Sequence, residues 1–359
     1  MRSAHRERLI VSLALRALDP ALNGVVARIE ESNQMMQTRK TPYRIATFAC
    51  CILATILLTS RAFATDLRLG IIGTDTSHVV EFTKLLNDDS NPNHMPGARV
   101  VAAFKSGSSD IPNSRDRVEE FSAELKDKWH IQFVSQIRDL CPLVDGILLE
   151  SVDGRVHLDQ FRQAAACGKS VFIDKPLAST FSDALEIARI AKASKVPWFS
   201  ASSFRFGPGQ AMRSPDITGA DVWGPGPLET HQQLDLSWYA IHSIEMLFTI
   251  MGPGVEQVTR TYTPDADVVT GVWKDGRIGI VRAIRPYSTI GAVVFHHNKP
   301  PSVYADVDNE YLPLVREIVK FFKTGVLPVS NDETLKIYEF MDAAQQSREH
   351  GGIPVNILK

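Results

Sequence analysis

The sequence lacks a marked excess of charge of either sign, because 39 Lys and Arg residues face 41 Asp and Glu residues and leave a formal net charge of -2. A basic surface that attracts nucleic acid or an anionic membrane is therefore not indicated. Internal repeats and low-complexity segments are also missing, which argues against a solenoid or a fibre. With 44% hydrophobic and 22% charged residues over 359 positions, the composition is that of a globular protein with room for two domains.

The chain has no apolar run of the roughly 20 residues that a membrane-spanning helix needs. The apolar stretch 45–58 is shorter, follows a basic stretch at 39–44 and precedes Ala62-Phe63-Ala64. A basic segment, a short apolar segment and an Ala-x-Ala pattern are the parts of a secretory signal peptide. We predict a signal peptide at 35–64, with cleavage after Ala64 and export to the periplasm or the medium.

Residues 1–34 lie upstream of this predicted signal, and we interpret them as an extension ahead of a true start at Met35 or Met36. The alternative is an uncleaved membrane anchor with a cytoplasmic extension.

Cysteine is scarce, and two of the four residues, Cys50 and Cys51, fall inside the predicted signal. Cys141 and Cys167 remain in the mature chain. They can pair in an oxidising compartment, but their spacing does not decide it. We interpret each as a small buried residue.

From Leu67 onward, short apolar runs alternate with segments of helical periodicity. This pattern predicts strands at 67–73, 98–104, 131–134, 144–149, 170–173 and 197–201, separated by helices after His78 and at 117–129, 157–167 and 182–193. Such alternation is typical of parallel βαβ units that bind ligands at the carboxyl ends of the strands. The predicted fold class is α/β, with a doubly wound parallel sheet at 65–206.

The segment 202–226 contains Gly, Pro and Ser and interrupts this rhythm, so we place the domain boundary near Phe206. A second domain at 207–359 is predicted to contain helices at 237–251, 311–324 and 332–348 and strands at 255–262, 267–273, 277–284 and 292–297. The close spacing of these strands favours antiparallel pairing.

The run from Gly168 to Ala178 ends a predicted strand with Asp174-Lys175-Pro176. Proline restricts the residue before it, so Lys175 is expected in an extended or turn conformation at the end of the strand. We predict that this strand delivers Lys175 to a functional site; the alternative is a solvated lysine in a turn.

Three motifs together resemble the Gfo/Idh/MocA oxidoreductases. They are Gly70-Ile71-Ile72-Gly73 at the first turn, the run from His157 through Gly168 to Asp174-Lys175-Pro176-Leu177-Ala178, and Tyr239-Ala240-Ile241-His242 with Glu245. The resemblance extends from about Leu67 to the C-terminus. It implies an N-terminal Rossmann domain and a C-terminal α/β domain with an open, mainly antiparallel sheet, through which dimers or tetramers of the chain are plausible.

The resemblance also implies an NAD- or NADP-linked oxidation of a sugar, cyclitol or related polyol. Lys175 would hydrogen-bond the reacting hydroxyl or carbonyl and stabilise a developing oxyanion. His242 would exchange the hydroxyl proton, because histidine has a pKa near working pH. Tyr239, three positions earlier, would donate a proton or position the substrate. The alternative for His242 is a residue that caps or packs the helix.

The resemblance places the cofactor against residues of the first turn and of the strand ends. These are Gly70, Gly73, Thr74, Asp75, Thr76, His78, Lys105, Ser106, Glu150 and Lys175. The second strand ends without an acid for a ribose hydroxyl, whereas Lys105 and Ser106 can accept a 2′-phosphate, which favours NADP over NAD. The alternative is a polar surface loop.

The chain departs from the family pattern where the cofactor would bind. Asp75 and His78 stand where the second and third glycines of the phosphate-binding turn would be, and a carboxylate repels a pyrophosphate. Glu150 adds a second acid, and Trp238 replaces the aspartate four residues before the histidine.

Two other functions remain open from the sequence. One is an exported binding protein that keeps the cleft for a carbohydrate-like molecule but has no redox cofactor. The other is a metal-dependent lyase or hydrolase, because carboxylates and imidazoles suit divalent cations. The ligands of such a site would come from Asp75, His78, Glu150, His242 and Glu245; the oxidoreductase interpretation assigns no metal.

Overall fold

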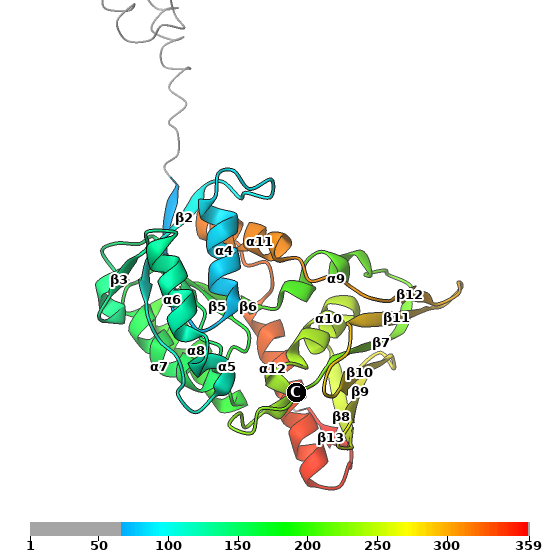
Figure 1. Cartoon of the computed structure of the whole chain (residues 1–359). Helices are drawn as coiled ribbons and strands as arrows, with labels where there is room; N and C mark the ends of the chain where they lie inside the picture. The colour runs from blue at the N-terminus through cyan, green and yellow to red at the C-terminus, as the bar shows by residue number, and fades with distance from the viewer. Residues whose placement is uncertain (1–65, 358–359) are drawn as a thin grey trace, which may run out of the picture. The chain divides into compact units, whose positions relative to one another are not determined.

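Two sheets form the framework of the part of the chain that the structure, a computed structural model, describes, residues 66–357 (Figure 1). The predicted signal peptide at 35–64 and the extension at 1–34 lie outside these residues. Within 66–357, no helix has the length and apolar character needed to cross a membrane.

The first sheet is parallel and has the strand order β3-β2-β1-β4-β5-β6. Its strands are β1 (Leu67–Ile72), β2 (Ala98–Phe104), β3 (Gln132–Val134), β4 (Gly146–Leu149), β5 (Ser170–Asp174) and β6 (Trp198–Ala201). The order reverses direction between β1 and β4, and ligands of such sheets bind at this switch point. The predicted doubly wound α/β domain is therefore confirmed.

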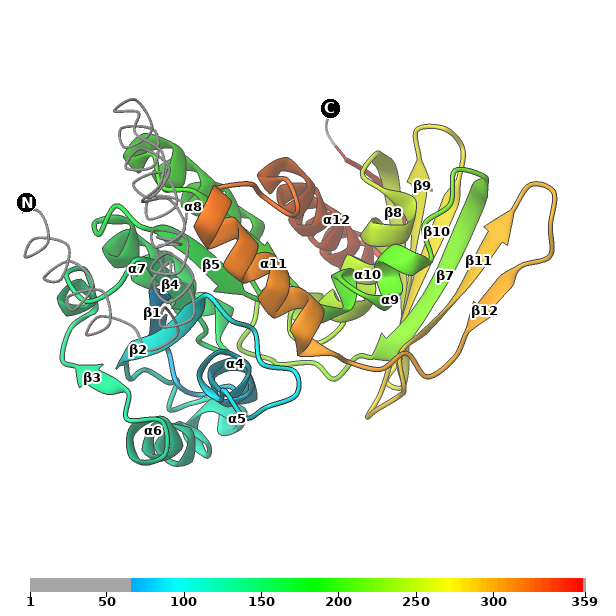
Figure 2. The same cartoon turned by 90° about the horizontal axis from the view of Figure 1, so that it is seen from above.

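Helices cover both faces of this sheet (Figure 2). They are α4 (Ser77–Asn87), α5 (Pro112–Arg115), α6 (Val118–Asp127), α7 (Gly154–Ala165) and α8 (Phe181–Ser194), with a 3-10 turn η2 at Ile137–Leu140. Side chains that precede the helices cap them: Thr76 accepts from the His78 N–H and Thr180 from the Asp183 N–H. α4 and α6 pack on one face, and α7 and α8 on the other.

The second sheet has the order β12-β11-β7-β10-β9-β8-β13. Its strands are β7 (Ile217–Pro225), β8 (Val255–Tyr262), β9 (Ala266–Trp273), β10 (Ile278–Ile284), β11 (Gly291–His296), β12 (Ser302–Tyr304) and β13 (Val355–Asn356). Pairing is antiparallel except between β7 and β10. α10 (Ile241–Met251), which is buried along its whole length, packs on this sheet.

No strand was predicted within 202–226, yet β7 in its second half lies in the middle of the second sheet. Gly219, Gly224 and Pro225 look like turn residues, yet here they allow close packing. A Cβ at Gly219 would lie 2.6 Å from the Ile278 carbonyl oxygen, and one at Gly224 would lie within 2.4 Å of Ser243 Oγ. Short elements do occupy the first half: η3 (Ser203–Arg205) and α9 (Pro208–Ala211).

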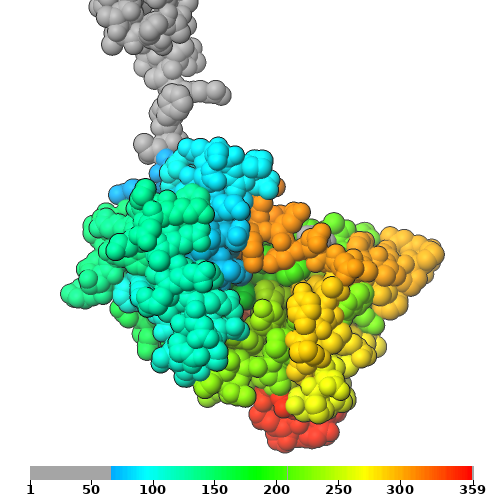
Figure 3. Space-filling model, viewed as in Figure 1, coloured from blue at the N-terminus to red at the C-terminus, as the bar shows by residue number. Residues whose placement is uncertain are grey.

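The last two long helices return to the first sheet. α11 (Tyr311–Thr324) buries Leu314 and Ile318 in the same core cluster as Leu69 and Ile71 of β1, and Figure 3 shows it beside α4 on the surface. α12 (Asn331–Glu349) contacts both α8 and β8. Its Tyr338 hydroxyl accepts from the Ala178 N–H at 3.0 Å and donates to the Ala178 carbonyl at 3.2 Å. The C-terminal part of the chain therefore holds the two sheets together.

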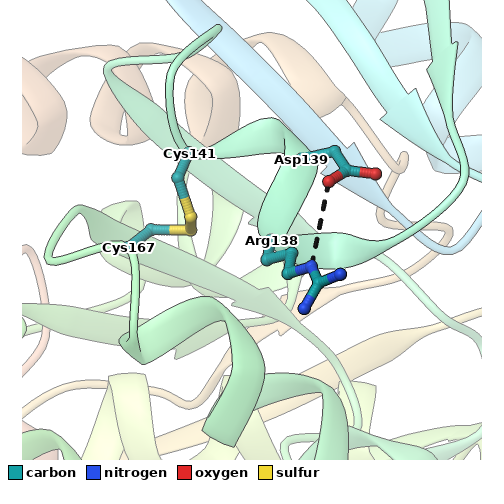
Figure 4. The surroundings of a disulfide bond; sticks show 4 residues. All are labelled: Arg138, Asp139, Cys141 and Cys167. Carbon is teal, nitrogen blue, oxygen red and sulfur yellow. Dashed lines mark ion pairs between the residues drawn. A yellow bond between two sulfur atoms is a disulfide. The ribbon is translucent and has the colours of Figure 1, made fainter.

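Cys141 and Cys167 form a disulfide with a Cα–Cα distance of 5.0 Å, beside the exposed pair Arg138 and Asp139 (Figure 4). It links the segment after η2 to the end of α7. The interpretation of the two cysteines as separate buried residues is wrong, because the fold brings positions 26 residues apart to bonding distance.

We expect replacement of both Cys141 and Cys167 by Ser to lower the free energy of unfolding by about 3 kcal/mol, because the bond closes a loop between residues 26 apart in the unfolded chain. Urea denaturation measures the difference. Reductant should lower the stability of the wild type by the same amount and leave that of the double variant unchanged. In a separate thiol assay, wild-type protein unfolded without reductant should show no reactive thiol in its mature part. A wild-type stability that does not respond to reductant contradicts the prediction.

Candidate active site between the two sheets

A polar cavity of about 420 Å³ lies between the carboxyl edge of the first sheet and the second domain. The first domain contributes Thr76, His78 and Lys175 to its wall, and the start of α10 contributes Tyr239 and His242. The three predicted catalytic residues, Lys175, Tyr239 and His242, thus face one cavity. Lys175 belongs to the first domain and the other two to the second.

Lys175 directly follows β5, which runs between β4 and β6, and its peptide bond to Pro176 is cis. The side chain is 8% exposed and lines the cavity. The alternative of a solvated lysine in a turn is therefore wrong, and the strand delivers this residue into the molecule.

His242 is the second residue of α10, and its Nδ1 lies 2.7 Å from Ser202 Oγ. Phe204 and Tyr239 contact the ring by their edges, with ring centroids at 5.5 and 5.9 Å. Burial, reinforced by the charges of Lys175 and His78, lowers the pKa of His242 well below its usual value. The ring is consequently neutral at pH 7 and able to accept a proton.

His78 forms a buried pair with Asp174: His78 Nδ1 lies 2.7 Å from Asp174 Oδ2. Tyr311 of α11 packs edge-on against the His78 ring at 4.8 Å. Burial alone would raise the pKa of Asp174, but the His78 charge and hydrogen bond outweigh it and lower that pKa. The sequence interpretation placed His78 in a cofactor turn and assigned Asp174 no role. The available signal was that both lie at the carboxyl ends of predicted parallel strands, which share one edge of the sheet.

Glu150 follows β4 at the same edge and is fully buried. Neither of its carboxylate oxygens accepts a hydrogen bond from any of the described residues. Burial, and then the neighbouring Asp174, raise the pKa of Glu150 well above its usual value, while Lys175 acts in the opposite direction. Glu150 is not part of the cavity wall.

The two glycines of the first turn are required by the chain's own packing. Gly73 has φ +86°, and a Cβ there would lie 2.5 Å from the Ser151 backbone nitrogen. At Gly70, a Cβ would approach Val144 Cγ1 to 2.9 Å. A glycine at these positions is therefore explained without a bound phosphate.

Asp75 joins the loops around the switch point. It is fully buried and accepts hydrogen bonds from Ser114 Oγ at 2.6 Å and from the Val152 N–H at 3.1 Å. We call these contacts the Asp75 bridge. Burial raises the pKa of Asp75, and the two hydrogen bonds act against this rise. On the other side of the turn, the Thr74 N–H donates to the Ser106 carbonyl at 3.2 Å.

The side chains at the end of β2 are also bound within the protein. Lys105 Nζ pairs with Glu119 at 2.5 Å, and Ser106 Oγ accepts from Gln160 Nε2 at 3.0 Å. The predicted 2′-phosphate contacts would have to replace these interactions.

A dinucleotide does not fit the turn in this arrangement. The Asp75 bridge spans the β1–β4 crevice in which a pyrophosphate would lie, and the bridge consumes the Val152 N–H as a donor. A buried carboxylate in that crevice also repels a pyrophosphate. Of the predicted cofactor-binding residues, Thr76, His78 and Lys175 face the cavity, whereas Gly70, Gly73, Thr74, Asp75, Lys105, Ser106 and Glu150 do not.

Glu245 has a different partner from the one that the metal-site alternative supposes. It pairs with Arg205 of η3 at 2.5 Å, and Arg205 also binds Glu333 of α12 at 2.5 Å. Burial raises the pKa of Glu245, against the effect of Arg205. This buried ion pair joins three elements of the domain junction and excludes Glu245 as a cation ligand here.

Residues 67–201 match the model of the Gfo/Idh/MocA family, described as an oxidoreductase family with an NAD-binding Rossmann fold. A comparison with curated protein sequences gave no match.

Solved structures of dehydrogenases resemble both domains. A probable dehydrogenase from Thermotoga maritima superposes with a TM-score of 0.66 at 20% identity, covering 81% of this chain and 99% of its own. The myo-inositol 2-dehydrogenase from Lactobacillus plantarum gives 0.64 at 17%, covering 82% and 100%. The myo-inositol dehydrogenase from Lactobacillus casei in complex with NAD(H) and myo-inositol gives 0.63 at 16%, covering 82% and 98%. At these identities the likeness shows a shared fold. The family match covers the first domain, residues 67–201, and agrees with the motifs from which the resemblance to the Gfo/Idh/MocA oxidoreductases was first drawn.

Proposed function

We propose that the chain is an enzyme that acts on a sugar, cyclitol or related polyol in the cavity, with Lys175 and His242 at the reacting centre. The observation that carries the proposal is that Lys175, Tyr239, His242 and His78, all able to hold or exchange protons, line one cavity. The myo-inositol in the complex of a protein with the same fold supports a polyol as the substrate class.

The cavity is suited to a small molecule with several hydroxyl groups. Its volume of about 420 Å³ is in the lower part of the range for small-molecule sites. Its wall also contains Asn113, Arg117 and Asp308, which supply hydrogen-bond donors and acceptors around the four groups named above.

The chain's own residues account for a proton transfer. In the tautomer with a proton on Nδ1, His242 donates to Ser202 Oγ, and Nε2 is then free to accept the proton of a substrate hydroxyl. The Lys175 ammonium is placed to hydrogen-bond the same oxygen and to stabilise negative charge that develops on it. Tyr239 lies beside His242 and is placed to orient the substrate.

The redox chemistry of the family requires NAD or NADP. The Asp75 bridge occupies the crevice in which the pyrophosphate of either cofactor would lie. The proposal therefore assigns proton transfer to these residues and derives no hydride transfer. The same observation supports a second candidate, a lyase or hydrolase on this fold that uses no redox cofactor.

We also propose that the protein acts after export. The signal-like pattern at 35–64 supports this, and so does the Cys141–Cys167 disulfide, because disulfides persist mainly in oxidising compartments. The thiol measurement described above also tests this proposal, since free thiols in the mature protein would oppose it.

Cofactor binding separates an oxidoreductase from a lyase or hydrolase that uses no redox cofactor. We expect wild-type protein to show no saturable binding of NADPH, followed by nicotinamide fluorescence, or of NAD, followed by protein fluorescence. Asp75→Gly removes the carboxylate from the crevice and should strengthen binding at least about tenfold, because one like charge next to the pyrophosphate is gone. Asp116→Asn, a change at an exposed carboxylate, is the matched control. Tight binding by the wild type would overturn the second candidate and restore the oxidoreductase.

Lys175→Ala should lower turnover by about 10² to 10⁴, since both its hydrogen bond to the reacting oxygen and its charge are lost. Sugars, cyclitols and their keto forms are screened by NMR for conversion and for deuterium incorporation from D₂O, which needs no redox cofactor. Lys128→Ala, at an exposed lysine, controls for a general loss of charge. Turnover unchanged in Lys175→Ala would remove this residue from the reacting centre.

The pH profile tests His242 as the base. Burial disfavours its charged form, so the ring stays neutral as pH falls through about 6.5, the usual histidine pKa. A base must be neutral to accept a proton, and kcat/KM should therefore hold its value at pH 6.5 and decline only at clearly lower pH. His242→Gln should abolish this acidic limb together with most of the activity. A limb centred at or above 6.5 would contradict the assignment.

A further inference from the structure

We propose that His78, Glu150 and Asp174 bind a divalent cation directly beneath the cavity. One ligand atom from each residue lies within 4.8 Å of the others. Two ligands of one cation, each 2.0 to 2.4 Å from it, lie at most about 4.8 Å apart, so the three atoms are close enough for small side-chain shifts to bring them onto one ion.

The unpartnered oxygens point to a missing positive partner. Glu150 is 0% exposed and Asp174 1% exposed. Both Glu150 oxygens and Asp174 Oδ1 accept no hydrogen bond within residues 66–357. Buried carboxylates are normally hydrogen-bonded, paired or bound to metal, because a buried charge without a partner is costly.

Lys175 does not satisfy these oxygens. Its ammonium charge acts on both carboxylates, but no hydrogen bond from it reaches the Glu150 oxygens or Asp174 Oδ1. With His78 neutral, as a metal-binding imidazole must be, this single ammonium balances one of the two negative charges. A divalent cation supplies the remaining charge and leaves one positive charge in excess at the site. That excess suits a bound hydroxide or a substrate oxyanion.

The fold places this cluster where a cation can reach a substrate. His78 begins α4 after β1, Glu150 follows β4 and Asp174 ends β5, and these three strands are neighbours in the sheet. His78 and Lys175 line the cavity, whereas the two carboxylates do not. One imidazole with two carboxylates suits Zn²⁺ or Mn²⁺, and three protein ligands leave a coordination position open. A cation held there would polarise the substrate oxygen that Lys175 and His242 approach.

The test measures cation binding without any substrate, so its result is independent of the proposed catalysis. Purified full-length protein is dialysed against EDTA and then titrated separately with Zn²⁺ and Mn²⁺ by calorimetry, with elemental analysis after removal of free metal. We expect one equivalent of cation per chain and a higher melting temperature in its presence. Glu150→Gln keeps the side-chain shape and should weaken binding about 100-fold or more, beyond the loss typical of a residue that only orients a ligand.

Glu245→Gln changes another fully buried carboxylate, the one paired with Arg205, and should retain the cation. Circular dichroism checks that each variant is folded. Equal affinity in wild type and Glu150→Gln would overturn the site. If Glu150→Gln does not fold, the wild type still decides: no stoichiometric uptake of either cation and no change in melting temperature would refute the proposal.

Discussion

Buried charge at the carboxyl edge of the first sheet is the constraint on which the site depends. β1, β4 and β5 end side by side. Asp174 ends β5, Glu150 and Lys175 directly follow β4 and β5, and His78 lies at the start of α4 after β1. In such a place each charged group needs a partner, because water is excluded. His78 and Asp174 bind each other, Lys175 lies beside the carboxylates, and Glu150 is left with unpartnered oxygens. The proposed acid–base chemistry and the proposed cation both follow from this arrangement.

The second domain completes the cavity, and buried contacts join it to the first. The Arg205 ion pairs join η3, α10 and α12, and Tyr338 ties α12 to the backbone at Ala178, three residues after Lys175. His242 is consequently fixed by Ser202 and Phe204 on one side and faces Lys175 across the cavity. Buried ion pairs contribute little net stability when compared with apolar packing, but breaking one is costly. Their effect here is to define one relative position of the two sheets.

Much of the fold was predictable because it rests on local patterns. The six strands and the covering helices of the first domain follow from hydrophobic periodicity, and α11 was predicted at the bounds it has, Tyr311–Thr324. β7 was missed because Gly219, Gly224 and Pro225 are residues that normally mark turns. Their suitability for a strand depends on Ser243 of α10 and Ile278 of β10, which are distant in sequence. The pairing of Cys141 with Cys167 could not be decided from the sequence for the same reason, because it depends on elements that are distant in the chain.

The candidate site divides along similar lines. The sequence predicted Lys175 from its position at a strand end, and the resemblance to the Gfo/Idh/MocA oxidoreductases added Tyr239 and His242. It also showed an acid at position 75 where a glycine was expected. Only the tertiary structure revealed that Asp75 bridges Ser114 and Val152, that His78 pairs with Asp174, and that Glu150 has no hydrogen-bond partner among the described residues. A side chain's partners and its burial are set by elements far apart in the chain, and the energies that decide charge and ligand binding depend on both.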